Sequence, residues 1–595
     1  MKSFITLVFL SLSLFIHAQL DIQVETINPT GEIRDSQAHV TVSGGQAPYQ
    51  YKWSKKDVAL TSPVAKGMDE GVEYTVRVTD ANGVSGIQSI IIEPTSVAEH
   101  LNSFFIPLVD AIANVLLWDP FAAIGIYDPV VYLANGEPYL HPNGDVVTQD
   151  CWLVVVVLIT AAFWFTIYFG FINFRAFGHA IQLMMGRYSK PEDKGEVSQF
   201  QALTAALSGT LGLGNISLVA VAIAIGGPGA TLWMILAGLI GMSSKFIECT
   251  LGVKYRNIDS NGEVSGGPMY YLSKGLAKRN LNGLGKVLAA LFAIMCVGGS
   301  LGGGNMIQAN QAYAQVTETF GQGTVPSLWF GIAMAVLIGL VIMGGIKSIA
   351  RVTDKLIPFA VVVYCVFAII IIGMNITNIG DAFAQIWHGA MNPDAAKGGF
   401  IGVMLMGFRR ASFSNEAGIG SASIAHSASK TDRPVSEGLV SLLEPFIDTV
   451  VVCTMTALVL VFTGYAQTPG DLTGSALTNA AFVSVFPWFD WVLLFSILMF
   501  AYATMISWSY YGMKSWAYLF GEKKWVKQTF NVLFMICTVI GTVSGLGAVV
   551  DFSDMMILGM AFPNIIGLLI MSKEVKQDLK AYMNDLKNGI IKRYR

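Results

Sequence analysis

Apolar segments long enough to cross a lipid bilayer recur along this chain from residue 152 to residue 571. A membrane-spanning helix needs about 20 consecutive, mainly apolar residues. Only 13% of the residues are charged, against about a quarter in soluble domains. We therefore predict an all-α polytopic membrane protein with 11 transmembrane helices. The segments lie near 152–172, 205–226, 230–250, 286–317, 326–345, 356–374, 400–428, 438–463, 487–512, 528–549 and 555–571.

Lysine and arginine are unevenly distributed over the loops between these segments. If the first helix runs from outside to inside, the inner loops and the C-terminal end hold 26 of these cations, and the outer loops after residue 173 hold one, Lys397. Cytoplasmic loops of membrane proteins carry the excess of positive charge. The sequence therefore predicts a protein of the inner (plasma) membrane, with residues 576–595 as a cytoplasmic tail.

The N-terminal end has the composition of a secretory signal peptide. Residues 1–18 combine a basic start at Lys2, an apolar core of 13 residues and a plausible cleavage end at Ala18. The apolar core is too short to span a bilayer as a helix. The chain that follows is therefore expected outside the inner membrane.

Residues 20–95 alternate β-branched or aromatic residues with polar ones, and glycine-containing turn signals separate the runs. This pattern predicts a small extracytoplasmic all-β sandwich. Its stretches SGGQAPYQYKWS and YTVRVTDANG resemble the immunoglobulin-like repeats of bacterial surface proteins. Residues 96–150 are expected to form a linker with an amphipathic helix.

Two predicted helices are interrupted by the same glycine motif. Gly-x-Gly-x-x-Ser begins at Gly212 and again at Gly418, 206 residues later and five helices further on. An odd number of helices per repeat gives the two halves opposite orientations. Matched interruptions in inverted halves indicate a transporter binding site, because freed backbone groups are tolerated only where they line a cavity. Close packing of helices through small residues would explain either motif alone.

Six short motifs link these interruptions to a known family. They are ALSGTLGLGNI, GGPGA, GMSSKFIECTLGVKYR, GGPMYYL, GGIKSI and FSNEAGIGSASIAH. They resemble the alanine/glycine:cation symporters, or sodium:alanine symporter family, and the resemblance covers residues 151–575. It implies a leucine-transporter-type 5+5 inverted repeat preceded by one extra helix. It also implies import of small neutral amino acids, alanine or glycine, with co-transported Na⁺, by alternating access and without a cofactor.

Candidate substrate contacts lie at the two interruptions and on two further helices. The carboxylate of an amino acid is expected at backbone N–H groups near residues 210–214, and its ammonium at oxygens of residues 413–417, because half-helix ends favour opposite charges. The predicted substrate-binding residues are Thr210, Gly212, Gly214, Asn215, Gln308, Phe413, Asn415 and Trp508. Contacts between helices would equally explain Gln308, Phe413 and Trp508.

The resemblance also implies a Na⁺ site between the first interrupted helix and the eighth core helix. Thr504 and Ser507 lie three residues apart and share one face of that eighth helix. Their expected partners are groups near Ala205 and Ser208. Hydroxyls bonded back to their own helix are the simpler alternative.

Charged residues within the apolar segments are expected to be paired. A lone carboxylate near the middle of the membrane costs about 2.5–3.5 kcal/mol on insertion scales. Glu416 is predicted to form a structural ion pair with Arg409 or Arg410. The alternative is that Glu416 faces the site and holds the cation or ammonium. Lys245 and Glu248 are expected to form a similar supporting pair.

No catalytic motif accompanies these features. The sequence contains no HExxH or Walker-type motif, and we expect no enzyme, no metal site beyond Na⁺ and no nucleic-acid partner. Two other functions stay open. One is a symporter that is H⁺-coupled or of broader amino-acid specificity. The other is a membrane sensor with an extracytoplasmic ligand-binding domain, although the sequence offers no cytoplasmic output domain. A partner of the β-domain is not predicted.

Overall fold

The computed structural model describes residues 20–27, 36–54, 62–68, 73–91 and, with gaps, 107–594. The gaps are 108, 126–127, 131–147, 149, 191, 213, 322, 392–398, 469–471, 473 and 544–546. The predicted signal peptide, residues 1–18, lies outside the described residues, as does most of the predicted linker. The chain divides into two compact units, one containing strands and the other the long helices.

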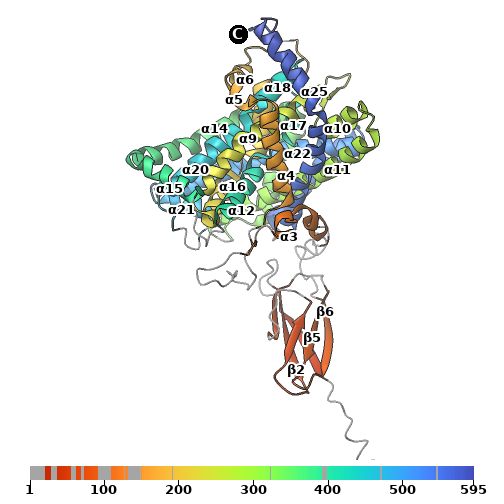
Figure 1. Ribbon diagram of the computed structural model, residues 1–595, viewed down its shortest axis with the longest axis vertical. Helices are drawn as coiled ribbons and strands as arrows, with labels where there is room; N and C mark the ends of the chain where they lie inside the picture. Colours follow the sequence, from red (N-terminus) through yellow and green to blue (C-terminus); the bar gives the residue numbers. More distant parts are fainter. Residues whose placement is uncertain are drawn as a thin grey trace, which may run out of the picture. The chain divides into compact units, whose positions relative to one another are not determined.

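The first unit contains two antiparallel three-stranded sheets (Figure 1). In order within each sheet, the strands are β1 (Asp21–Ile27), β2 (Ser36–Ser43) and β4 (Val64–Met68), then β3 (Gln50–Trp53), β5 (Glu73–Thr79) and β6 (Ser85–Ile91). Alternate residues such as Val40, Trp53 and Val76 share one buried core. Two sheets over one core is the arrangement of a sandwich, and the immunoglobulin-like relationship stays a prediction.

The second unit consists almost entirely of helices (Figure 1). Its elements are α3 (Pro120–Ala123), α4 (Leu153–Tyr168), α5 (Ile172–Arg175), α6 (Phe177–Met184), α7 (Gln199–Thr210), η1 (Gly214–Leu218), α8 (Val219–Gly226), α9 (Ala230–Lys254), β7 (Asn257–Ile258), β8 (Val264–Ser265), α10 (Pro268–Ala277), α11 (Asn282–Leu301), η2 (Gly302–Met306), α12 (Ile307–Phe320), α13 (Ser327–Ile342), α14 (Gly345–Met374), η3 (Ile376–Asn378), α15 (Ile379–Met391), α16 (Gly399–Asn415), α17 (Ala422–His426), α18 (Pro434–Ser441), α19 (Leu443–Pro445), η5 (Phe446–Cys453), α20 (Thr454–Phe462), α21 (Gly474–Val483), α22 (Phe489–Phe520), α23 (Lys524–Val543), α24 (Gly547–Gly559) and α25 (Ala561–Lys587). Residues 109–116, within the predicted linker, are also helical.

Within the described residues, seven helical stretches are long and apolar enough to cross a membrane, and a bent pair of helices brings the number to eight. The apolar helices α4 and α13 are shorter, with 16 residues each. Helical structure coincides with every one of the 11 predicted segments. The multi-pass helical architecture is therefore confirmed, whereas the count of eleven crossings and the inverted repeat stay predictions.

Both predicted interruptions are present where the glycine motifs lie. Helix α7 ends at Thr210, and the pair η1–α8 continues from Gly214 at an angle of 55°. Helix α16 ends at Asn415, and α17 begins only at Ala422. The second motif needs its glycines, because Gly418 and Gly420 have φ values of 95° and 99°, a region that side chains disfavour.

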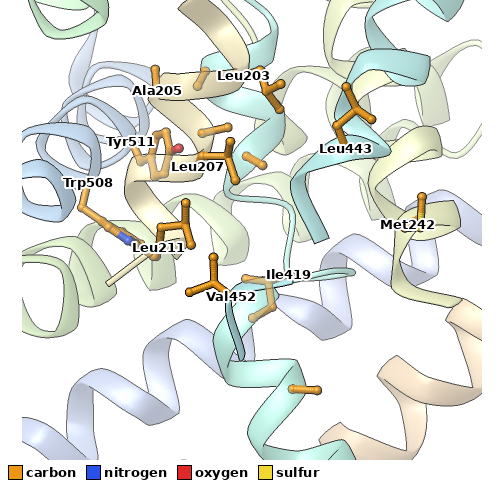
Figure 2. Close-up of a cluster of buried hydrophobic side chains, with 14 of the residues drawn as sticks. Leu203, Ala205, Leu207, Leu211, Met242, Ile419, Leu443, Val452, Trp508 and Tyr511 are labelled. Carbon is orange, nitrogen blue, oxygen red and sulfur yellow. The ribbon is translucent and has the colours of Figure 1, made fainter. Parts of the chain in front are cut away.

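The first interrupted helix is anchored by apolar packing. Leu203, Leu207 and Leu211 belong to one buried cluster with Trp508 and Tyr511 of α22 (Figure 2). Large buried side chains each contribute about 1.5–3 kcal/mol relative to exposure. This packing holds α7 against α22. The two helices thereby fix the position of the first interruption.

Candidate functional site

A cavity of about 270 Å³ is lined by residues from both helix interruptions. Its lining combines charged, polar and aromatic side chains with glycine backbone. The lining residues are Gly209, Thr210, Gly212, Gly214, Ser217, Leu218, Gly303, Ile307, Gln308, Gln311, Arg410, Phe413, Glu416, Ser475, Thr504, Trp508, Asp554 and Ile557. Segments distant in sequence are thus brought together around one cavity that has both polar and apolar walls.

Six of the eight predicted substrate-binding residues line this cavity. They are Thr210, Gly212, Gly214, Gln308, Phe413 and Trp508. The Thr210 hydroxyl donates to the Leu207 carbonyl at 3.3 Å, so it is bonded within its own helix. That these six residues contact a substrate stays a prediction.

The two predicted asparagines do not line the cavity, because their amides are bonded within the fold. Asn215 Oδ1 accepts from the Gly212 N–H at 3.0 Å, and its Nδ2 donates to Asp448 Oδ1 at 2.8 Å. Asn415 Nδ2 donates to Thr449 Oγ1 at 3.1 Å. That Asn215 and Asn415 bind substrate stays a prediction. Both amides hold the interrupted backbone in position.

Two buried oxygens at the cavity lack a hydrogen-bond partner within the described part of the chain. They are Gln308 Oε1 and Thr504 Oγ1. The Gln308 amide is held at its other end, where Nε2 donates to the Gly303 carbonyl at 3.1 Å. Buried polar groups are nearly always hydrogen-bonded, so these two atoms indicate where a ligand or ion completes the site.

Trp508 forms one wall of the cavity and is fixed from two sides. Its indole Nε1 donates to the Gly209 carbonyl at 3.2 Å, which ties α22 to α7. Gly304 of η2 packs on the other side of the side chain, where an added Cβ would lie 2.3 Å from Trp508 Cβ. Only glycine lets η2 approach α22 this closely.

Gly304→Ala is therefore expected to displace Trp508 and to reduce transport about 10-fold or more, since overpacking a dense interior costs about 1–3 kcal/mol. Gly373→Ala is the matched control, because an added Cβ there meets nothing within 4 Å. Uptake by proteoliposomes and thermal unfolding of both variants measure the effect. Equal uptake by the two variants would contradict the tight-packing argument.

The four residues predicted for Na⁺ lie together between α7 and α22. Ser208 Oγ contacts Ser507 Oγ directly and also donates to the Ala205 carbonyl at 2.9 Å. Thr504 lies one turn before Ser507 and lines the cavity, whereas the other three residues do not. An added Cβ at Gly212 would lie 3.2 Å from Thr504 Oγ1, so this hydroxyl adjoins the first interruption. The group holds several oxygen donors, which suit a hard cation such as Na⁺.

The predicted ion pair of Glu416 with Arg409 or Arg410 is not formed within the described residues, and that prediction is corrected. Glu416 follows the end of α16 and has a φ of 51°, a left-handed conformation that ends the helix. Its Oε2 accepts a hydrogen bond from Ser421. Glu416 is buried and lines the cavity. The geometry favours the alternative, in which its carboxylate faces the site.

The two arginines have separate surroundings. The Arg409 guanidinium carbon lies 3.1 Å from the ring centroid of Trp152, a cation–π arrangement. Arg410 lines the cavity, and so does Asp554 of α24. Asp554 was missed because it falls between two predicted helices. An acid beside an apolar run is itself a signal of function in membrane proteins, and that signal could have found it.

A network of fully buried charged groups adjoins the second interruption. Lys245 Nζ lies 2.9 Å from Glu444 Oε1, so the predicted partner of Lys245 is wrong. Glu248 instead accepts from Asn564 Nδ2 at 3.1 Å. His426 lies 3.6 Å from Glu444 and 2.6 Å from Glu437. Charges this deep are retained only when paired, and the network supports the loop that carries Glu416.

The sequence model of the "Sodium:alanine symporter family" matches residues 138–595. The chain belongs to this family. The symporter is 40% identical over 438 residues to "Sodium/alanine symporter AgcS" of Methanococcus maripaludis, an alignment covering 73% of this chain and 95% of AgcS. It is 36% identical over 442 residues to "Probable sodium/glutamine symporter GlnT" of Bacillus subtilis, covering 73% and 89%. The crystal structure of MhsT in complex with L-phenylalanine is similar with a TM-score of 0.43 at 16% identity, covering 63% of this chain and 98% of MhsT.

Family membership confirms the coarse predictions made from the motifs. This symporter is a multi-pass membrane carrier and not an enzyme, and Na⁺ is its co-transported ion, with no cofactor. The match begins at residue 138, so the N-terminal strands lie outside it.

Proposed function

We propose that this symporter imports alanine or glycine together with Na⁺ by alternating access. Na⁺-coupled amino-acid symport follows from the family, and the small substrate is the proposal. The observation that carries it is the cavity of about 270 Å³ between the two interruptions. Pockets for drug-sized ligands begin at about 300 Å³, so this cavity suits a small molecule.

The two interruptions offer opposite partial charges to a zwitterion. Helix α16 ends at Asn415 beside the cavity, and carbonyl groups at a helix C-terminus attract cations. The pair η1–α8 begins at Gly214, and N–H groups at a helix N-terminus attract anions. An amino acid would place its ammonium near Glu416 and its carboxylate near Gly214. Gln308 Oε1, which lacks a protein partner among the described residues, is a further acceptor for the ammonium.

The walls around this polar core are apolar and limit the substrate side chain. Phe413, Trp508, Ile307 and Ile557 line the cavity together. A methyl group or a hydrogen fits between such side chains without leaving a polar group unpaired. This lining supports alanine and glycine over larger polar substrates.

Thr504→Ala is expected to raise the Na⁺ concentration for half-maximal uptake about 10-fold, since losing a hydrogen-bonding or ligand oxygen costs about 1–1.5 kcal/mol. The Na⁺ dependence of alanine uptake into proteoliposomes measures this shift. Thr529→Ala is the control, because that exposed hydroxyl only donates to the Trp525 carbonyl of its own helix. An unchanged Na⁺ dependence in Thr504→Ala would remove Thr504 from the proposed ion site.

H⁺-coupled transport is the second candidate, and the buried network favours it. The network and two buried neighbours, Glu416 and Asp448, together hold five carboxyl groups and two cations. The carboxyl groups are those of Glu248, Glu416, Glu437, Glu444 and Asp448, and the cations are Lys245 and His426. Uncompensated buried charge is costly, so such a set tends to hold protons. Similarity to GlnT also keeps a broader substrate range as an alternative.

One uptake experiment separates these functions. Proteoliposomes are loaded at fixed pH, and radiolabelled alanine uptake is compared in Na⁺ and in choline, with glycine, D-alanine, L-alanine and L-glutamine as competitors. Our proposal requires that uptake stop in choline and that glycine and alanine compete strongly. Uptake that continues in choline and follows an imposed pH gradient would establish H⁺ coupling. Strong competition by glutamine would establish broader specificity.

We also propose the inner membrane as the location, with the β unit outside and the C-terminus in the cytoplasm. The charge bias of the loops supports this orientation. Labelling of single cysteines introduced at Ser85 and Lys587 by a membrane-impermeant reagent in intact cells tests it. Labelling should be confined to the cysteine at position 85.

A further inference from the structure

A groove of about 510 Å³ lies where the end of α4 meets the second half of α25. Three of its lining residues are cationic, Arg175, Lys576 and Lys580. None of its lining residues is acidic, and Ile167 and Leu579 are among the apolar ones. The two helices pack against each other, as Figure 1 shows in orange and dark blue.

The three cations form no ion pair within the described residues. Lys576 Nζ lies 4.0 Å from the ring centroid of Tyr168, and Arg175 Nη1 donates to the Gly170 carbonyl at 3.2 Å. Both contacts orient positive charge without neutralising it. The groove therefore presents net positive charge on a partly apolar surface.

The acidic residues of α25 are paired elsewhere. Glu574 contacts Lys254 and Arg279, and Asp585 contacts Arg433. These carboxylates are therefore engaged with cations on other elements. These carboxylates therefore do not neutralise the cations of the groove.

The surface beside the groove is strongly apolar. Five side chains on α4, in the turn that follows and on α5 are each 50–58% exposed: Phe163, Trp164, Ile167, Phe171 and Phe174. In a multi-pass membrane protein, exposed aromatic side chains at the ends of spanning helices contact lipid. Helix α25 changes from apolar to charged after Met571, so the groove lies at the boundary between acyl chains and headgroups.

We propose that this groove binds an anionic phospholipid, with its phosphate held by Arg175, Lys576 and Lys580. The acyl chains would lie along the exposed face of α4. Basic pockets between transmembrane helices at a membrane surface suit anionic headgroups. A free phosphate or an acidic peptide would match the charge but would leave the adjoining aromatic surface uncovered.

Native mass spectrometry of the full-length protein tests this assignment. The protein is purified in detergent and exposed to equal amounts of phosphatidylglycerol and phosphatidylcholine. The wild type should retain phosphatidylglycerol preferentially. Each lysine near a membrane surface strengthens anionic-lipid binding about 5-fold, so Lys576→Gln with Lys580→Gln should weaken retention about 25-fold.

Two further variants make the result specific. Lys573→Gln with Lys587→Gln removes the same charge from α25 outside the groove and should retain the lipid. Lys576→Arg with Lys580→Arg keeps the charge and should also retain it. The proposal would be overturned if Lys573→Gln with Lys587→Gln weakened lipid retention as much as the groove variant does. It would also be overturned if the wild type showed no preference for phosphatidylglycerol. Displacement of the lipid by millimolar glycerol phosphate would also overturn it, because the groove would then be a site for a free anion.

Discussion

Lys245→Met is expected to lower the free energy of unfolding by about 3–5 kcal/mol, because removing one partner of a buried pair leaves an uncompensated charge. Lys245 Nζ lies 2.9 Å from Glu444 Oε1, and both side chains are 0% exposed. His426 lies 3.6 Å from the same carboxylate and cannot replace a lysine at contact distance. The variant should show a large fall in melting temperature in detergent and reduced yield of monodisperse protein.

The same helix supplies the control for this prediction. Lys254 of α9 also forms ion pairs, with Glu574 and Asp578, but its side chain is 23% exposed. Partly exposed pairs contribute about 0–1 kcal/mol, so Lys254→Met should be nearly neutral. Lys245→Met combined with Glu444→Gln should recover most of the stability. Similar melting temperatures for the two single variants would show that burial of the Lys245 pair does not matter.

Glu416→Gln is expected to reduce Na⁺-driven alanine uptake about 100-fold at subsaturating substrate, since a hydrogen bond to a charged group contributes about 1.5–3 kcal/mol. The carboxylate lines the cavity at the end of α16 and is the acid nearest in sequence to the second interruption. Glutamine keeps the size of the side chain and its bond to Ser421, but it removes the negative charge offered to the ammonium. Initial rates in proteoliposomes measure the loss.

A control separates loss of charge at the site from loss of stability. Asp381→Asn neutralises an exposed carboxylate on α15 that does not line the cavity, and its uptake should equal that of the wild type. The melting temperature of Glu416→Gln should stay close to the wild-type value. Full uptake by Glu416→Gln would exclude a direct role for this carboxylate.

The helix interruptions could be predicted because their cause is local. Glycine spacing alone indicated where α7 and α16 end, since these residues permit backbone that side chains disfavour. Residues adjacent to the interruptions, such as Thr210 and Phe413, consequently also line the cavity. The hydropathy of each segment located the helices for the same reason.

The partners of the buried polar groups could not be predicted, because they come from distant segments. Lys245 pairs with Glu444, 199 residues away, although Glu248 stands three residues along the same helix. Asn215 and Asn415 had the chemistry of ligand contacts, and only the positions of Asp448 and Thr449 show that their amides are already bonded. Proximity in sequence does not predict hydrogen-bond partners in a protein interior, because nearly every buried polar atom must be bonded to whichever group lies beside it in the fold.

The Asn215 side chain has a mechanical consequence. Its amide oxygen accepts from the Gly212 N–H at the bend of the first interrupted helix, and its amide nitrogen donates to Asp448 in the π-helical segment η5. One side chain therefore links the bend to η5. Straightening the first helix would leave the Asn215 amide and the Asp448 carboxylate without these hydrogen bonds. Each unsatisfied buried group would cost about 1–3 kcal/mol. The bend and η5 therefore behave as a single rigid part. We expect the bend and η5 to move together during transport, with the hinges at the ends of this unit.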